Sequence, residues 1–225
     1  MKKTVRILCS ILCAALCLAL LAGCADHKAP ALRDGDHLVY PGIAFGSTPE
    51  AVLAALNRTE ADITVERDQP ADENQSFSEY IFSVTGPTLF GDETKTGFTF
   101  RQYLQEGLQL ECITLLYPDD VDMEERLQLL TDRLGAPTDS QVDGGLYLNL
   151  EPGSVKGHVV YWDSAAKAPT SDERDIPAER LYWTDDACLF YYGGQMEDYT
   201  GPRNLLMLRS FSVSGEAVTP TDAAG

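Results

Sequence analysis

Few residues able to carry acid–base or nucleophilic chemistry stand at spacings that would bring them together. Of the three histidines, His27 and His37 lie in a polar N-terminal stretch, and His158 lies in a predicted strand. A histidine base needs a placed nucleophile and an orienting carboxylate, and a zinc site needs more His or Cys ligands than this pattern supplies. The sequence has no Gly-x-Ser-x-Gly elbow, phosphate loop or His-Glu-x-x-His motif. We predict no catalytic residue, no metal and no cofactor.

Carboxylates are plentiful and gather at Asp119, Asp120, Asp122, Glu124 and Glu125. Acids in the first turn of a helix complement its dipole and cap its free N–H groups, which is the interpretation we favour. Calcium is an alternative ligand of such oxygen-rich segments, although the glycine and the spacing of the helix–loop–helix calcium motif are missing. Two acids could also serve a glycoside hydrolase, but nothing in the sequence selects a pair.

Three pairs of adjacent aromatic residues fall in predicted strands. Neighbouring strand residues point to opposite faces of a sheet, so one ring of each pair can fill the core while the other points outward. An outward row of Tyr and Trp is typical of a surface that binds a protein or stacks on a sugar. The alternative is that both faces are covered and every ring belongs to the core. The possible ligand face consists of Tyr161, Trp162, Tyr182, Trp183, Tyr191 and Tyr192.

The N-terminus carries the most specific pattern in the chain. Lys2, Lys3 and Arg6 precede an uncharged, mostly apolar run over residues 7–22. This run is shorter than the roughly 20 apolar residues of a membrane span, and its length is typical of a secretory signal. We therefore predict a signal peptide over residues 1–23.

The run ends in the motif Leu21-Ala22-Gly23-Cys24. This motif resembles the lipobox of bacterial lipoproteins at all four positions. The resemblance implies cleavage between Gly23 and Cys24 and lipidation of the Cys24 thiol by acyl chains such as palmitate, two of which suffice for stable anchoring. The alternatives are an uncleaved N-terminal membrane helix, with Cys24 a bystander, and a secreted product without lipid.

The charge balance excludes two classes of partner. The 225 residues include 17 basic and 35 acidic ones, a net charge of −18. Without the leader, fourteen basic residues remain against all thirty-five acids, a net charge of −21. A nucleic-acid binder and a polybasic membrane patch both need clustered Lys and Arg, so neither is expected.

Two cysteines remain when the leader and the lipidated residue are set aside, Cys112 and Cys188. In an extracytoplasmic setting they could form a disulfide. Free cysteines also behave as small buried hydrophobes on strands, and no spacing rule decides between the two interpretations.

Two short helices are predicted after a lipidated cysteine and flexible tether over residues 24–40. The first begins at a capping box of Ser47 and Glu50, and the second at a capping box of Asp122 and Glu125. The second helix ends before Gly135. Its apolar face is formed by Met123, Leu127, Leu130 and Leu134.

Alternating patterns and turn residues predict the strands. They comprise a half-buried strand over 80–84, a hairpin of 98–104 and 108–117, and strands over 146–150, 155–162, 180–184, 187–192 and 205–213. Residues 214–225 are predicted to be a disordered tail. The result is an α+β fold of short capped helices on antiparallel sheet over residues 41–213, with possible halves 41–117 and 118–213.

The order of a helix followed by strands occurs twice, with Gly-Ser-Thr-Pro-Glu at 46–50 and Leu-Gly-Ala-Pro at 134–137. These features resemble the small envelope lipoproteins and inhibitors of the β-lactamase-inhibitor-like fold. The resemblance implies two tandem helix-plus-meander units that bind other proteins, and it carries over no functional residue.

We therefore expect a lipoprotein anchored at the extracytoplasmic face of the cell membrane, or on an outer membrane where the source has one. It would act as a non-enzymatic protein-binding or envelope assembly module, with a protein partner in the envelope and no nucleic acid. The alternative is an envelope glycan hydrolase or glycan-binding lipoprotein that uses paired carboxylates and exposed aromatic rings. A small-ligand-binding lipoprotein of a transporter ranks last, because the chain is short for two lobes.

Overall fold

The chain divides into residues 1–30 and residues 31–225 in the computed structural model. The structure describes residues 31–72, 76–87, 89–103, 107–138, 159–169, 175–185 and 204–213. The leader, the lipobox, the predicted strands over 146–150 and 187–192 and the predicted tail lie outside these residues. Within them, no helix is both long and apolar enough to cross a membrane.

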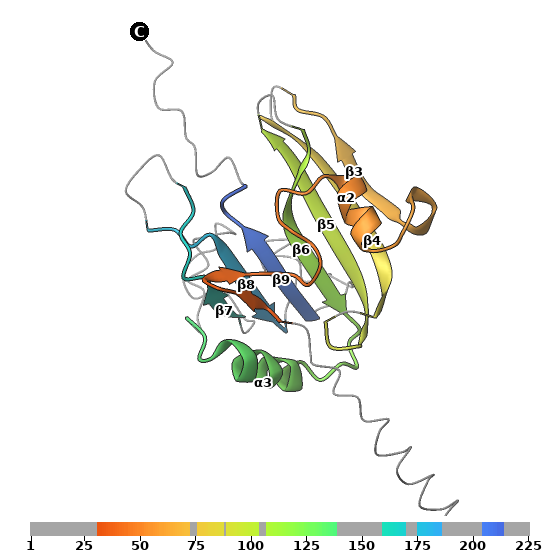
Figure 1. Ribbon diagram of the computed structural model, residues 1–225. Helices are drawn as coiled ribbons and strands as arrows, with labels where there is room; N and C mark the ends of the chain where they lie inside the picture. The colour runs from red at the N-terminus through yellow and green to blue at the C-terminus, as the bar shows by residue number, and fades with distance from the viewer. Residues whose placement is uncertain are drawn as a thin grey trace, which may run out of the picture. The chain divides into compact units, whose positions relative to one another are not determined.

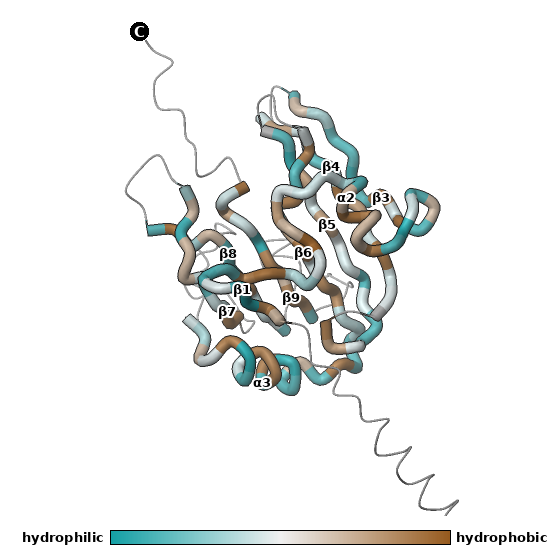
Figure 2. The backbone as a smooth tube through the Cα atoms, in the orientation of Figure 1, coloured by the Kyte–Doolittle hydropathy of each residue, from teal (hydrophilic) through white to brown (hydrophobic). Residues whose placement is uncertain are grey.

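A seven-stranded antiparallel sheet dominates the structure (Figure 1). Its strand order is β3-β4-β5-β6-β9-β8-β7. The strands are β3 (Thr64–Gln69), β4 (Phe77–Pro87), β5 (Glu93–Tyr103), β6 (Gln109–Tyr117), β7 (Val159–Asp163), β8 (Glu179–Thr184) and β9 (Asn204–Ser210). Figure 2 shows hydrophilic residues along the edge strand β3 and more apolar ones along the paired strands β6 and β9.

The strand order consists of two meanders. Helix α2 (Pro49–Ala55) and a short 3₁₀ turn precede β3 to β6, and helix α3 (Met123–Leu134) precedes β7 to β9. The last strands of the two meanders, β6 and β9, pair with each other at the centre of the sheet. Over the described ranges the fold is thus a mostly antiparallel sheet with two short α-helices, richer in strand than the predicted α+β class suggests.

Both helices pack on one face of the sheet, which we call the helix face. Val52 of α2 and Leu130 of α3 are fully buried in the core. The indole of Trp183 donates to the Met123 carbonyl, and that of Trp162 to the Gly135 carbonyl, each at 2.9 Å. The two tryptophans therefore hold α3 at its two ends, against β7 and β8.

A strap over residues 31–45 also lies on the helix face. Its two-residue strands β1 (Arg33–Asp34) and β2 (His37–Leu38) pair with each other. Leu32 and Leu38 are buried in the core, between these two short strands and the large sheet. The prediction of a flexible tether over 24–40 is therefore wrong for residues 31–40. Leu32 and Leu38 are separated by the five polar or small residues 33–37, a spacing that gives no helical or strand periodicity, although both pack on the sheet.

The first helix begins one residue later than predicted. Its N-cap is Thr48, whose Oγ1 accepts from the Ala51 amide at 3.4 Å. Ser47 is not available as the cap because its carbonyl accepts from the Leu110 amide at 2.8 Å. The backbone of this segment is thus fixed to β6 before the helix starts.

The second helix occurs over the predicted residues, and its cap provides a first test. The Asp122 carboxylate accepts from the Glu125 amide at 3.1 Å, and Gly135 ends the helix with a φ of 84°. Replacing Asp122 by alanine is expected to lower the free energy of unfolding by about 1 kcal/mol, the usual value of an N-cap. Urea denaturation would measure this loss. Glu124→Ala is the control, because Glu124 is exposed and makes no cap contact in the described structure; an equal effect of both changes would contradict the cap.

Candidate functional site

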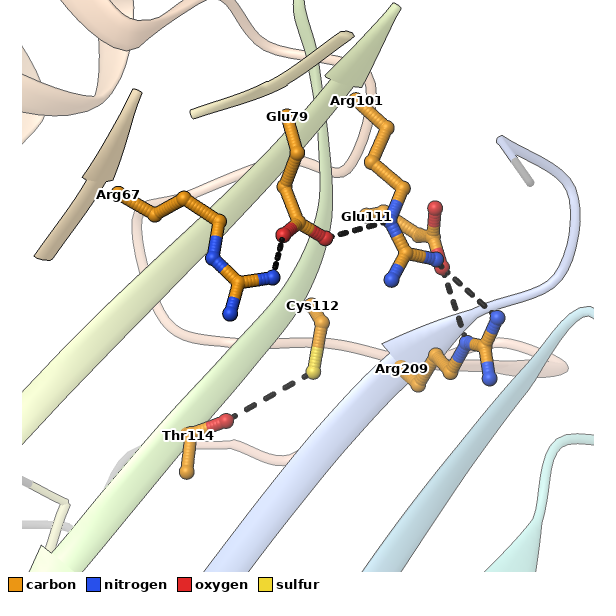
Figure 3. A network of polar contacts seen from close by, with 7 residues as sticks. All are labelled: Arg67, Glu79, Arg101, Glu111, Cys112, Thr114 and Arg209. Atoms are coloured by element: carbon orange, nitrogen blue, oxygen red, sulfur yellow. Dashed lines mark hydrogen bonds and ion pairs between the residues drawn. The ribbon is translucent and has the colours of Figure 1, made fainter. Parts of the chain in front are cut away.

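The face of the sheet opposite the helices, which we call the ladder face, carries a row of charged side chains (Figure 3). One residue from each of five neighbouring strands contributes to this charge ladder. Its members are Arg67 of β3, Glu79 of β4, Arg101 of β5, Glu111 of β6 and Arg209 of β9.

The ladder is continuous from end to end. Glu79 accepts from Arg67 Nη1 at 2.6 Å and from Arg101 Nε at 3.0 Å. Glu111 accepts from Arg101 Nη1 at 3.0 Å, and from Arg209 Nε at 3.0 Å and Nη2 at 2.9 Å. Each carboxylate thus bridges two guanidinium groups.

Strand register and one irregularity bring these groups together. Glu79 pairs directly with Arg101, and Cys112 with Arg209, so each pair shares a face. Between the pairs Thr99–Cys112 and Phe100–Leu110 the register shifts, which leaves Glu111 as the extra residue of a bulge. A bulge re-aims side chains, and here it allows the Glu111 carboxylate to reach arginines on both neighbouring strands.

The two carboxylates of the ladder are buried, whereas Arg67 at one end of it is exposed. The Arg67 side chain is 54% exposed, whereas Glu79 and Glu111 are 4% and 1% exposed. Buried charges are tolerated only when they are paired and hydrogen-bonded, as these are. The five groups together carry one positive charge, in a chain whose net charge is −18. The ladder is therefore a rigid, slightly basic strip on an acidic protein.

A further ion pair continues this row of charges across β8 and β7. Arg180 of β8 lies opposite Arg209 and is held by Asp163 of β7, with Nη2 and Oδ2 2.9 Å apart. Burial acts to lower the pKa of Arg180, but the hydrogen bonds and charge of Asp163 outweigh it and the pKa is raised. The Phe211 ring lies 5.3 Å from the Arg209 guanidinium and 6.0 Å from that of Arg180.

The aromatic pairs do not form the exposed face considered from the sequence. Trp162 and Trp183 are 1% and 2% exposed, because they point to the helix face beneath α3. Tyr182 is 1% exposed on the ladder face, and Tyr161 is only partly exposed, under the Arg180 guanidinium at 4.2 Å. A row of outward rings is therefore wrong for these four positions; Tyr191 and Tyr192 lie outside the described residues.

Cys112 also lies on the ladder face and is a free thiol. Burial raises the pKa of this thiol to about 11, so it is protonated and unreactive at neutral pH. Its Sγ lies 3.7 Å from Thr114 Oγ1. Of the two interpretations left open, a disulfide and a small residue on a strand, the free thiol of Cys112 fits the second; Cys188 lies outside the described residues.

The acids of the α3 start form no metal site in the described structure. Asp122 caps the helix, and Glu125 pairs with Arg126 at 3.2 Å. Within the described ranges, no group of three His, Cys, Asp or Glu side chains could hold a metal ion. His27 and His158 lie outside those ranges. A small pocket under the strap, lined by Leu38, Leu181 and other apolar residues, contains no titratable side chain apart from Tyr40.

His37 fastens the strap to the sheet. Its Nδ1 lies 3.0 Å from Glu179 Oε1, and the Leu38 amide donates to Glu179 Oε2 at 3.3 Å. Glu179 is 6% exposed, and its own amide donates to Ser164 Oγ at 2.9 Å. Hydrogen bonding to Glu179 and its charge raise the pKa of His37 above 6.5, with smaller contributions from Asp36 and Asp34.

This contact predicts a pH dependence of stability. The folded-state pKa of His37 lies above its ordinary value, so its contribution is complete below about pH 6.5 and is lost as the pH rises through the folded-state pKa. The His37 side chain is 56% exposed, so we expect no more than about 1 kcal/mol. Urea denaturation at several pH values would measure it, and His37→Gln should remove the slope. A slope of unchanged size in that variant would assign the effect to other groups.

Sequence reasoning did not find the charge ladder. Each member is a single charged residue in a strand, and nothing in the local pattern marks it as a neighbour of the others. The predicted strand over 80–84 begins after Glu79, and local alternation does not show which charged residues of neighbouring strands lie beside it.

Comparison with known proteins adds no assignment. No family model, no curated protein and no solved structure matches the chain. The function has to be argued from the leader and from the two faces of the sheet.

Proposed function

We propose that this chain is a lipid-anchored, extracytoplasmic lipoprotein that binds another protein through the ladder face and does not act as an enzyme. The anchor is the lipidated thiol of Cys24, after removal of residues 1–23. The membrane is the cell membrane, or an outer membrane where the source has one. No nucleic acid is involved.

The charge ladder is the observation that carries the binding role. Replacing buried ion pairs by apolar residues is often neutral or stabilising, so stability alone does not explain such a chain of pairs. Arginine is enriched at protein interfaces, and side chains that are already ordered cost little entropy to bind. Both helices and the strap pack on the other face, so the exposed Arg67 end of the ladder lies on a surface that they do not cover.

The topology supports a second part of this proposal, the tandem organisation. Each meander follows one short helix, as in the β-lactamase-inhibitor-like lipoproteins that the sequence motifs resemble. The contact between Glu111 and Arg209 joins β6 of the first unit to β9 of the second. The proposed binding strip thus crosses the junction of the two units.

Glycan hydrolysis has weaker support. Glu79 and Glu111 are two buried carboxylates close to the same Arg101 side chain. Each of them lies between two guanidinium groups, which is the reverse of the apolar surroundings in which a glycosidase acid holds its proton. The geometry favours a structural and recognition role for both.

Crosslinking in native membranes would test the proposal with the full-length protein. We expect one recurrent protein partner by mass spectrometry, absent when Cys24→Ala prevents anchoring. Arg67→Ala should lower the yield of this partner about fivefold, which corresponds to the roughly 1 kcal/mol that marks a significant interface residue.

The matched control is Arg58→Ala, which removes an exposed arginine near α2 instead of one on the ladder face. An equal loss for Arg58→Ala and Arg67→Ala would point to net charge and not to the ladder. Enrichment of glycan in place of protein would favour the alternative function.

A further inference from the structure

The strap determines on which face of the sheet a membrane anchor enters the fold. We propose that the lipid anchor draws the helix face toward the bilayer, so that the ladder face, with its exposed Arg67, is turned away from the membrane. The inference rests on the proposed lipidation of Cys24 and adds an orientation to it.

The chain between the proposed anchor and the fold is short. Seven residue steps separate Cys24 from Ala31, the first residue that the structure describes. Whatever path those residues take, seven steps of extended chain span at most about 25 Å. Ala31 is therefore confined to a thin layer above the lipid.

The strap cannot lengthen this connection without unpacking. Leu32 follows Ala31 directly, is 5% exposed and belongs to the core cluster. Its carbonyl accepts from the Val39 amide at 3.0 Å. The next contacts, from His37 and Leu38 to Glu179, tie the strap to β8. The fold is thus attached firmly from its first described residues onward.

This attachment lies on the helix face of the sheet. Leu32 and Leu38 line one pocket with Leu181 and Leu208, which point to the helix face together with Trp183. The ladder members point the other way, as the alternation of Arg180 and Leu181 along β8 requires. The anchor therefore pulls on the face that carries the helices.

The charged residues of the strap do not attract it to the membrane surface. Asp34 and Asp36 are exposed on it, beside Arg33 and His37. Acidic residues are not attracted to an anionic lipid surface, which binds clusters of Lys and Arg. The short chain between Cys24 and Ala31 therefore holds the helix face near the bilayer, without a lipid-binding patch on the strap.

Energy transfer to the membrane would test the orientation. The full-length, lipidated chain is placed in vesicles of phosphatidylcholine and phosphatidylglycerol that contain a headgroup-labelled acceptor, with Cys112→Ser and Cys188→Ser to remove other thiols. A donor dye is attached either at Asp34→Cys on the strap or at Thr85→Cys on the ladder face; both positions are exposed. We expect about twofold more transfer from Asp34→Cys, because packed layers on a sheet are about 10 Å thick.

A longer connection is the matched control. About twelve Gly and Ser residues inserted between Pro30 and Ala31 would extend the maximum span to about 65 Å. The insertion should bring the two transfer efficiencies close together.

The outcomes separate the orientation from the anchor. If vesicle binding is the same with and without Cys24→Ala, the lipid anchor of the proposed function fails. If binding depends on Cys24 but Thr85→Cys transfers as much as Asp34→Cys or more, anchoring stands and the orientation is overturned.

Discussion

Replacing Glu111 by alanine is expected to lower the free energy of unfolding by about 3–5 kcal/mol, the range found when one partner of a buried ion pair is removed. Glu111 is 1% exposed and accepts three hydrogen bonds, one from Arg101 and two from Arg209. Its loss leaves the Arg209 guanidinium, in a residue 8% exposed, without its charged partner in the ladder. Urea denaturation at neutral pH would measure the change.

Glu66→Ala is the matched control, because Glu66 also bonds a cation in a strand but in an exposed setting. It pairs with Lys95 at 2.8 Å, and the two side chains are 35% and 48% exposed. An exposed pair contributes about 0–1 kcal/mol, so this variant should remain close to the natural protein. Similar losses for Glu66→Ala and Glu111→Ala would show that the ladder does not behave as a buried network.

Trp183→Ala is expected to cost about 3–5 kcal/mol, as large aromatic truncations in a core do. Trp183 is 2% exposed, and its indole donates to the Met123 carbonyl at the start of α3. The change removes both a filled volume beneath the helix and one of the two indole hydrogen bonds to its ends. We therefore expect hydrogen exchange in Trp183→Ala to speed up, relative to the natural protein, more for the amides of α3 than for those of β4 and β5. This local effect would come in addition to the loss of global stability.

Two further variants separate packing from the hydrogen bond. Trp183→Phe keeps most of the ring and should lose much less, with about 1 kcal/mol for the missing donor. Tyr161→Ala tests a ring that is only partly exposed and lies outside the helix face. If Trp183→Ala cost no more than Tyr161→Ala, the burial of Trp183 beneath α3 would not describe the molecule in solution.

The helix and strands that are marked by the spacing of neighbouring residues could be predicted from the sequence. The apolar spacing of Met123, Leu127 and Leu130 defined α3 over its observed residues, and an Asp and a Gly marked its ends. The hairpin of β5 and β6 and the strands β4, β7, β8 and β9 were predicted close to their observed positions. Alternation along a strand is a property of neighbouring residues, so the sequence carries it directly.

Features that depend on distant pairing were not predictable in this way. Leu32 and Leu38 stand on either side of the polar residues 33–37, and only the sheet beneath them makes them core. Glu111 has its role because a bulge and the strand β9, 98 residues away, surround it. The interpretation of the aromatic pairs as an exposed row is wrong for a related reason, since the exposure of Trp162 and Trp183 depends on where α3 packs.

The pairing of β6 with β9 has a consequence for how the molecule is made. The first meander can form as soon as residue 117 is available, but its last strand then has an unpaired edge that contains Ile113 and Leu115. Such an edge is a template for aggregation until another strand covers it. That strand is the last one described in the chain, so closure is a late, long-range event of the kind that folds slowly. A chain delivered across a membrane from its N-terminus would therefore need protection of β6 until residues 204–210 arrive.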